Sequence, residues 1–156
     1  MKKISCSNGK EAIVDDEMFD LLSGYKWDVL SGYAIRKEKI DGKRTIVSMH
    51  HLVSGRPESG YVSDHINGDR LDNRRENLRF CTLSQNSMNR GHRKNNKSGY
   101  KGVSYYKNNG KWRAYIRIKG KTKHLGYFTS IESAALAYNL GAATFFGEYS
   151  KINEVL

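Results

Sequence analysis

The sequence predicts an α+β protein made of two small modules. Its 156 residues carry 27 Lys and Arg against 16 Asp and Glu, a formal net charge of +11. Residues 1–90 hold 15 basic and 13 acidic side chains, whereas residues 91–156 hold 12 basic and only 3 acidic ones. Short segments of alternating polarity lie between glycine and asparagine turns, and two helix-capping patterns interrupt them. These observations predict a near-neutral module followed by a strongly basic one, each with a small sheet and few helices.

Composition excludes several classes of protein. Hydrophobic residues make up 38% of the chain, too many for a wholly disordered protein. No run approaches the ~18–20 apolar residues of a membrane span, and no apolar stretch follows the N-terminus as in a secretory signal. Cys6 and Cys81 lie far apart, which argues against a disulfide framework and a cysteine-built zinc site. We expect a soluble, cytoplasmic protein that does not bind membranes.

The first third of the chain predicts mostly strands. Alternating polarity predicts strands at Gly9–Val14, Tyr33–Ile40 and Arg44–Met49. The last two are expected to form a hairpin around Asp41-Gly42. Short helices are predicted at Asp16–Ser23 and His51–Ser54. In the first of these, Phe19, Leu21 and Leu22 are expected to face inward. His50, just before the second helix, is interpreted as a packed or surface histidine rather than a direct participant in chemistry.

The segment 62–90 concentrates the side chains that hydrolytic chemistry needs. Asp64 can bind a hard divalent cation through oxygen, and the adjacent His65 can take a proton from water at neutral pH. Neighbouring strand residues face opposite sides, so both can serve one site only if the strand ends there. A polar loop and a second strand follow. Thr82-Leu83-Ser84-Gln85 then matches a capping box that begins a helix running to about residue 90.

Other polar residues of this segment predict supporting roles. The predicted helix brings Asn86 back toward the two strands, where its carbonyl oxygen could complete a metal site. Asp72, Asn73 and Arg74 are expected to shape the loop, because Asx side chains stabilise turns. Three arginines of this segment allow two interpretations of equal weight, as phosphate contacts or as solvated loop charges: Arg74, Arg75 and Arg79.

Residues 91–97 form a basic segment without an apolar anchor and predict a linker. Beyond it, three strands are predicted at Lys101–Tyr106, Lys111–Lys119 and Thr122–Phe128. One face of the middle strand is apolar and the other basic with an aromatic residue: Trp112, Ala114, Ile116 and Ile118 against Arg113, Tyr115, Arg117 and Lys119. A cationic sheet face of this kind suits the major groove of DNA, which admits a β-structure as well as a helix.

A helix is predicted after the third strand. Thr129 and Glu132 match a capping box, and Gly147 is a plausible end. Apolar residues then recur at helical spacing: Ile131, Ala134, Ala135, Tyr138, Ala142 and Phe145. We expect this helix to cover the apolar face of the sheet and to leave the basic face open.

The spacing of Asp64-His65, Asn77 and Asn86 resembles the HNH nuclease motif, in the form that begins with Asp-His and has Asn at the two later positions. The resemblance implies a ββα-metal fold with one divalent metal ion, Mg²⁺ or Mn²⁺. His65 would be the general base, and Asn77 would hold it in its working orientation. Asp64 and Asn86 would hold the metal, which stabilises the leaving 3′ oxygen. Such enzymes leave a 5′ phosphate and a 3′ hydroxyl.

The C-terminal module resembles the AP2 DNA-binding domain. The matching segments are Tyr100-Lys101-Gly102-Val103, Gly110-Lys111-Trp112-Arg113-Ala114-Tyr115-Ile116-Arg117, His124-Leu125-Gly126-Tyr127-Phe128 and Glu132-Ser133-Ala134-Ala135-Leu136-Ala137-Tyr138. The resemblance implies that the outer sheet face contacts DNA through Lys101, Ser104, Tyr106, Arg113, Tyr115, Arg117, Thr122 and His124. Ser104, Tyr115 and His124 depart from the plant version, which usually has Arg, Glu and Trp there, so plant-type target sequences are not expected.

Together these features predict a metal-dependent DNA endonuclease, and the resemblance implies one of the homing type, similar to mobile nucleases of bacteriophages. The predicted organisation is an HNH module at 1–90 with its ββα-metal core at about 60–90, a linker at 91–97 and an AP2-like domain at 98–156. The expected partner is double-stranded DNA, and the chain would act as a monomer or weak homodimer. Two alternatives are a non-enzymatic DNA-binding regulator with a degenerate HNH fold, and an RNA-binding or structural nucleoprotein suggested by charge alone.

Overall fold

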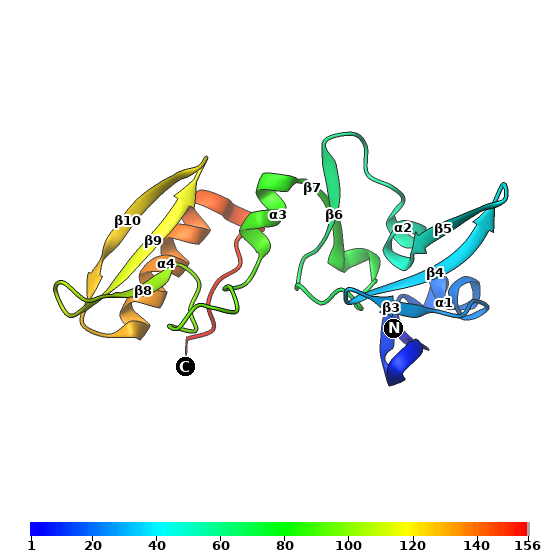
Figure 1. The fold of residues 1–156 in the computed structure, drawn as a ribbon, viewed down its shortest axis with the longest axis horizontal. Helices are drawn as coiled ribbons and strands as arrows, with labels where there is room; N and C mark the ends of the chain where they lie inside the picture. Colours follow the sequence, from blue (N-terminus) through cyan, green and yellow to red (C-terminus); the bar gives the residue numbers. More distant parts are fainter. Residues whose placement is uncertain (156) are drawn as a thin grey trace. The chain divides into compact units, whose positions relative to one another are not determined.

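The computed structural model describes residues 1–155 and contains short helices and small antiparallel sheets (Figure 1). The α+β prediction is therefore confirmed at this level. The chain divides into two compact units, Met1–Asn86 and Ser87–Leu156. The division falls inside a helix, because the Met88 carbonyl accepts hydrogen bonds from Lys101 Nζ and from the backbone of Lys151. Within residues 1–155 no helix has both the length and the apolar character needed to cross a bilayer.

The first unit contains three small sheets. The strands are β1 (Lys2–Ser5), β2 (Glu11–Val14), β3 (Asp28–Leu30), β4 (Tyr33–Ile40), β5 (Lys43–Ser48), β6 (Tyr61–His65) and β7 (Leu78–Thr82). They pair as β1-β2, as a sheet in the order β3-β4-β5, and as β6-β7. Helices α1 (Asp16–Ser23) and α2 (Met49–Ser54) belong to the same unit, and α3 (Leu83–Asn89) begins in it. The predicted Asp41-Gly42 turn is confirmed, with φ of 49° and 78° at the two residues.

The sequence pattern missed two short strands of this unit, and the prediction for one inward side chain was wrong. The strands β1 and β3 have four and three residues, too few for alternation to be recognised. Leu21 was expected to face inward but is 56% exposed, whereas Leu22 is fully buried. Phe19 lies three residues before Leu22 and shares its helix face, while Leu21 points about 100° away.

The core of the first unit joins its N-terminal strands to both helices. Its buried members are Ile4, Ala12, Val14, Leu22, Trp27, Ala34, Met49 and Val53. The long loop between β6 and β7 is also fastened to this core. Ile13 of β2 donates its N–H to Leu71 O at 2.8 Å, and Asn73 donates its N–H back to Ile13 O at 2.8 Å. The polar loop is thus paired with a buried strand instead of lying free in solvent.

The second unit is a three-stranded antiparallel sheet covered on one face by a helix (Figure 1). Strands β8 (Val103–Tyr106), β9 (Lys111–Ile118) and β10 (Lys121–Phe128) are ordered β10-β9-β8. Helix α4 (Ile131–Phe146) packs Ala134, Ala135 and Tyr138 against the face that carries Ala114 and Ile116. The apolar face of the middle strand is as predicted.

Two details of α4 differ from the prediction. The N-cap is Ser130 and not Thr129, because Ser130 Oγ accepts the backbone N–H of Ser133 at 3.0 Å. Phe145 is 41% exposed and its neighbour Phe146 is the buried residue. Phe146 lies four residues after buried Ala142, on the same helix face, so a one-residue shift in register decides which phenylalanine joins the core. The predicted end at Gly147 is confirmed.

Candidate functional site

The β6-β7 hairpin and α3 carry the residues predicted to do chemistry. Asp64 pairs with Arg79 and His65 with Leu78 in an antiparallel register. Strand β6 ends at His65, as joint use of Asp64 and His65 requires. The predicted capping box begins α3: Thr82 N–H donates to Gln85 Oε1 at 2.9 Å, and Gln85 N–H donates to Thr82 Oγ1 at 3.3 Å. These short-range features rigidly connect the second strand to the helix.

His65 is buried at the end of β6, with only 4% of its surface exposed. Its ring centroid lies 5.9 Å from that of Tyr33 and 5.4 Å from that of His50. Burial lowers the pKa of His65 below its ordinary value, while the hydrogen bond with Asn73 and the charge of Asp64 partly oppose this effect. The imidazole is therefore neutral at pH 7 and can accept a proton.

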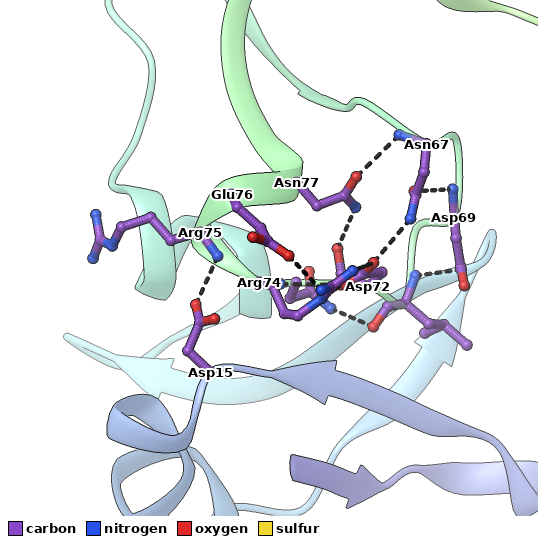
Figure 2. A network of polar contacts seen from close by, with 10 residues as sticks. Asp15, Asn67, Asp69, Asp72, Arg74, Arg75, Glu76 and Asn77 are labelled. Atoms are coloured by element: carbon purple, nitrogen blue, oxygen red, sulfur yellow. Dashed lines mark hydrogen bonds and ion pairs between the residues drawn. The ribbon is translucent and has the colours of Figure 1, made fainter. Parts of the chain in front are cut away.

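Asn73, rather than Asn77, contacts the His65 ring in this structure. Asn73 Oδ1 lies 3.3 Å from His65 Nε2. The Asn77 amide instead spans the loop: its Oδ1 accepts the Asn67 N–H at 3.0 Å, and its Nδ2 donates to Asp72 O at 2.8 Å (Figure 2). Sequence reasoning assigned Asn73 to loop structure alone and so missed its contact with the histidine. No periodic pattern exists in a loop that could have indicated it.

Asp72 and Arg74 structure this loop, as predicted. Asp72 is 2% exposed, and Arg74 donates to both of its carboxylate oxygens at 2.9 and 2.7 Å. Asn67 Nδ2 donates to the same carboxylate at 2.8 Å (Figure 2). These contacts, those with Arg74 foremost, lower the pKa of Asp72 and keep it ionised. The loop is therefore held by a closed polar network on the side where it leaves β6.

Of the two predicted metal ligands, Asp64 is paired with an arginine, and the backbone of Asn86 hydrogen-bonds to Cys81. Asp64 is 6% exposed and accepts from Arg79 Nε at 3.0 Å, with Arg79 Nη2 at 2.9 Å. Burial above all, and then the charge of Asp64, raise the pKa of the Cys81 thiol, whereas the charge of Arg79 and the backbone N–H of Asn86 lower it. The backbone of Asn86 thus contacts the Cys81 thiol, and the charge of Asp64 acts on the same group. Cys81 itself is a free thiol.

A hard cation fits these donors better than a soft one. Within residues 1–155 no three His, Cys, Asp or Glu side chains gather closely enough to hold a metal by themselves. One carboxylate and one amide oxygen would leave most coordination positions to water and phosphate. Mg²⁺ is commonly bound in that way, through one or two carboxylates. The donor set therefore fits Mg²⁺ or Mn²⁺ and does not fit a structural zinc.

Comparison with known proteins places this hairpin in a family. A family model described as HNH endonuclease matches residues 44–88, which include β6, β7 and most of α3. An uncharacterised HNH endonuclease of Acanthamoeba polyphaga mimivirus is 32% identical over 150 residues, covering 94% of this chain and 76% of the relative. This chain belongs to the HNH endonuclease family. A second relative of this HNH protein is protein 3.8 of Escherichia phage T7, 30% identical over 102 residues, or 65% of this chain and 84% of the relative.

The C-terminal region of this HNH protein carries an AP2-like domain. It is similar to an AP2-like ethylene-responsive transcription factor of Arabidopsis thaliana, with 39% identity over 59 residues. That match covers 38% of this chain and only 12% of the transcription factor. No solved structure matches the chain.

The uncovered sheet face of the AP2-like domain gathers most residues predicted to contact DNA. Cross-strand pairs join them directly: Ser104 with Arg113, Tyr115 with His124, and Arg117 with Thr122. The Arg113 guanidinium lies over the rings of Tyr106 and Tyr115, at 5.7 and 5.0 Å from their centroids. The basic and aromatic side chains of this HNH protein therefore form one continuous surface.

Tyr127 also belongs to this face, and the sequence pattern missed it. A bulge between His124 and Gly126 shifts the register of β10, so Tyr127 pairs with Arg113. Its ring lies 5.3 Å from that of Tyr106 and 5.4 Å from that of His124. A glycine inside a predicted strand is the sequence signal that could have indicated this bulge. In the structure Gly126 has a φ of +134°.

Lys101 lies apart from the other predicted DNA contacts. It precedes β8, it is half-buried, and its ammonium donates to the Met88 carbonyl. Burial and the nearby Lys151 lower the pKa of Lys101 to about 8. In the free protein the Lys101 ammonium is therefore hydrogen-bonded within its own unit.

Proposed function

We propose that this chain is a metal-dependent DNA endonuclease of the homing type, which hydrolyses phosphodiester bonds of double-stranded DNA. The observation that carries the proposal is His65, buried at the end of β6, next to the Asp64 carboxylate and hydrogen-bonded to an asparagine. A histidine in this state suits a general base. Membership of the HNH endonuclease family supports the same reaction class.

In the proposed reaction His65 accepts a proton from the attacking water. The water oxygen bonds to phosphorus, and the bond from phosphorus to the 3′ oxygen breaks. The 3′ oxygen takes a proton from solvent water as it leaves, so the products are a 5′ phosphate and a 3′ hydroxyl. Asp64 and Asn86 would hold one Mg²⁺ or Mn²⁺ ion. When bound, this ion would supply positive charge to the phosphate and to the leaving oxygen. Asn77 is proposed to act through the loop that it ties together, by keeping the residues around His65 in place.

The AP2-like domain is proposed to position the DNA for cutting. The nuclease part would be residues 1–90, with a ββα-metal core at about 60–90, and residues 91–97 would link it to the AP2-like part at 98–156. A β-hairpin with a short helix offers little surface for reading a sequence. A tethered second DNA-binding surface raises the local concentration of DNA at the hairpin. We propose that the chain acts as a monomer or a weak homodimer.

Nicking of supercoiled plasmid DNA tests the enzymatic proposal. Conversion to the open-circular or linear form is expected with Mg²⁺ or Mn²⁺ and is expected to stop when EDTA removes the metal. Gel electrophoresis of the products measures both, and a supplied excess of Mg²⁺ over EDTA should restore cutting. Binding of duplex DNA without cutting, across both metals and several substrates, would instead support the DNA-binding regulator.

Arg117→Ala is expected to weaken binding of duplex DNA about equally for all sequences. The slope of log Kd against the logarithm of salt concentration is expected to become smaller by about one. Arg117 is exposed on the uncovered face, where a phosphate can reach it. The matched control is Lys123→Ala, which removes one charge from the same sheet. Lys123 lies on the other face, with its Nζ 4.5 Å from the centroid of Phe145. Fluorescence anisotropy across a salt series measures both variants, and equal effects would contradict the proposed DNA-binding face.

A further inference from the structure

The side-chain amide of Asn73 has a single orientation because both of its ends have partners. Asn73 is 1% exposed, and its Nδ2 donates to the Leu71 carbonyl at 3.1 Å. The atom that faces His65 Nε2 at 3.3 Å is therefore Oδ1. An amide oxygen can only accept a hydrogen bond, so the contact requires Nε2 to carry the hydrogen.

We infer that Asn73 fixes the tautomer of His65, with the hydrogen on Nε2, so that Nδ1 is the nitrogen that takes the proton from water. The inference rests on the proposed nuclease function and specifies its base at the level of one atom. A neutral imidazole carries one N–H, and its other nitrogen presents a lone pair. The opposite tautomer would set the lone pair of Nε2 against that of Asn73 Oδ1.

The loop holds Asn73 rigidly enough to act in this way. Its backbone N–H donates to Ile13 O at 2.8 Å, and the Leu71 carbonyl that anchors its amide also accepts the Ile13 N–H at 2.8 Å. Both hydrogen bonds therefore connect Asn73 to Ile13 of β2. The residues on either side of Ile13 in this strand, Ala12 and Val14, are fully buried. A buried strand, rather than a mobile loop, sets the position of the amide.

Packing around the histidine opposes a ring flip that would exchange the two nitrogens. The Tyr33 ring lies 5.9 Å from that of His65 at an interplanar angle of 51°, and the His50 ring lies 5.4 Å away at 83°. A half-turn of the imidazole would have to pass these rings. Orientation and tautomer are thus determined together.

Proton balance is complete with this assignment. As the water oxygen bonds to phosphorus, its proton moves to Nδ1, and the resulting imidazolium carries a hydrogen on each nitrogen. The bond from Asn73 Oδ1 to the Nε2 hydrogen strengthens as the ring becomes positive, because charge-assisted hydrogen bonds are the stronger ones. The departing 3′ oxygen takes a proton from a solvent water to become the 3′ hydroxyl. The imidazolium then releases its Nδ1 proton to solvent, and the ring regains its starting tautomer.

Nitrogen NMR of the full-length protein tests the tautomer without any assay of cutting. With ¹⁵N-labelled histidine, and with the His65 signals assigned from the spectrum of His65→Gln, the neutral ring is expected to carry its hydrogen on Nε2. In Asn73→Leu, which has similar volume and no acceptor, a mixture of tautomers is expected. In Asn73→Asp, which keeps an oxygen facing the ring, the Nε2–H tautomer is expected to return.

Plasmid nicking by the same variants tests the catalytic consequence. Asn73→Leu is expected to lower kcat by about 10- to 100-fold with KM nearly unchanged, and Asn73→Asp is expected to restore part of the rate. A hydrogen on Nδ1 in the wild-type ring, or an Asn73→Leu protein with full kcat and an unchanged tautomer, overturns the inference. A wild-type chain that shows the Nε2–H tautomer but cuts no DNA overturns the proposed function, and with it the catalytic role of Nδ1.

Discussion

His65→Ala is expected to slow cutting of plasmid DNA by about 10²- to 10⁴-fold, the usual contribution of a general base. The imidazole is the group that the proposed reaction needs to receive the water proton, and burial keeps it in the neutral form. Binding of duplex DNA should be nearly unchanged, because the contacts proposed for binding lie on the AP2-like sheet. Initial rates of nicking with Mg²⁺, beside anisotropy with a labelled duplex, measure the two effects separately.

Loss of a buried ring could also lower the rate by disturbing the hairpin, and a second variant separates the two causes. His65→Gln retains a polar side chain of similar length and cannot serve as the base. It is expected to be as inactive as His65→Ala while keeping the wild-type unfolding midpoint in urea. Wild-type cutting by His65→Gln would contradict the assignment of the base, and reduced cutting accompanied by a lowered midpoint would point to packing instead.

Gly102→Ala is expected to destabilise the AP2-like unit by about 3 kcal/mol. The backbone at Gly102 has φ of +71°, a conformation that costs an L-residue about 1–2 kcal/mol. A methyl group there would lie 2.0 Å from Tyr138 Cδ2 and 2.6 Å from the backbone oxygen of Tyr115. Tyr138 is 2% exposed and cannot move aside, and overpacking of this kind costs about 1–3 kcal/mol.

Such a loss is large for a unit with so small a core, because stability of small domains is marginal. Thermal unfolding followed by circular dichroism should show a lowered midpoint, and binding of duplex DNA should fall in proportion to the unfolded fraction. Gly120→Ala is the matched control: its φ is +79°, but nothing lies within 4 Å of the added methyl group. Equal destabilisation of the two variants would show that the backbone conformation alone, and not the contact with Tyr138, decides the cost.

Features that depend on a few neighbouring residues were predictable from sequence. The Thr82–Gln85 capping box, the Asp41-Gly42 turn and the two faces of β9 all form as expected, since each depends on spacing within one element. Errors of one residue occur where two local solutions compete. Ser130 caps α4 in place of Thr129, and Phe146 is buried in place of Phe145, because packing of the whole helix selects between them.

The candidate site could be predicted in its residue types but not in its hydrogen bonds. The Asp-His pair and the later asparagines stand out in the sequence, and the HNH family is confirmed. The sequence did not indicate which asparagine contacts His65. Asn73 reaches the ring because its loop pairs with Ile13, sixty residues earlier in the chain. No local pattern encodes a contact between segments so far apart.

Local features of this protein can be predicted from neighbouring residues, whereas contacts between distant segments cannot. Charge, alternation and capping patterns were enough to predict the α+β class and the basic C-terminal part. The contact of Asn73 with His65, and the bulge at Gly126 that brings Tyr127 onto the uncovered face of the AP2-like sheet, depend on tertiary structure. Secondary structure follows from steric and hydrogen-bonding preferences within a few residues, whereas these contacts depend on which distant strands pair and in which register.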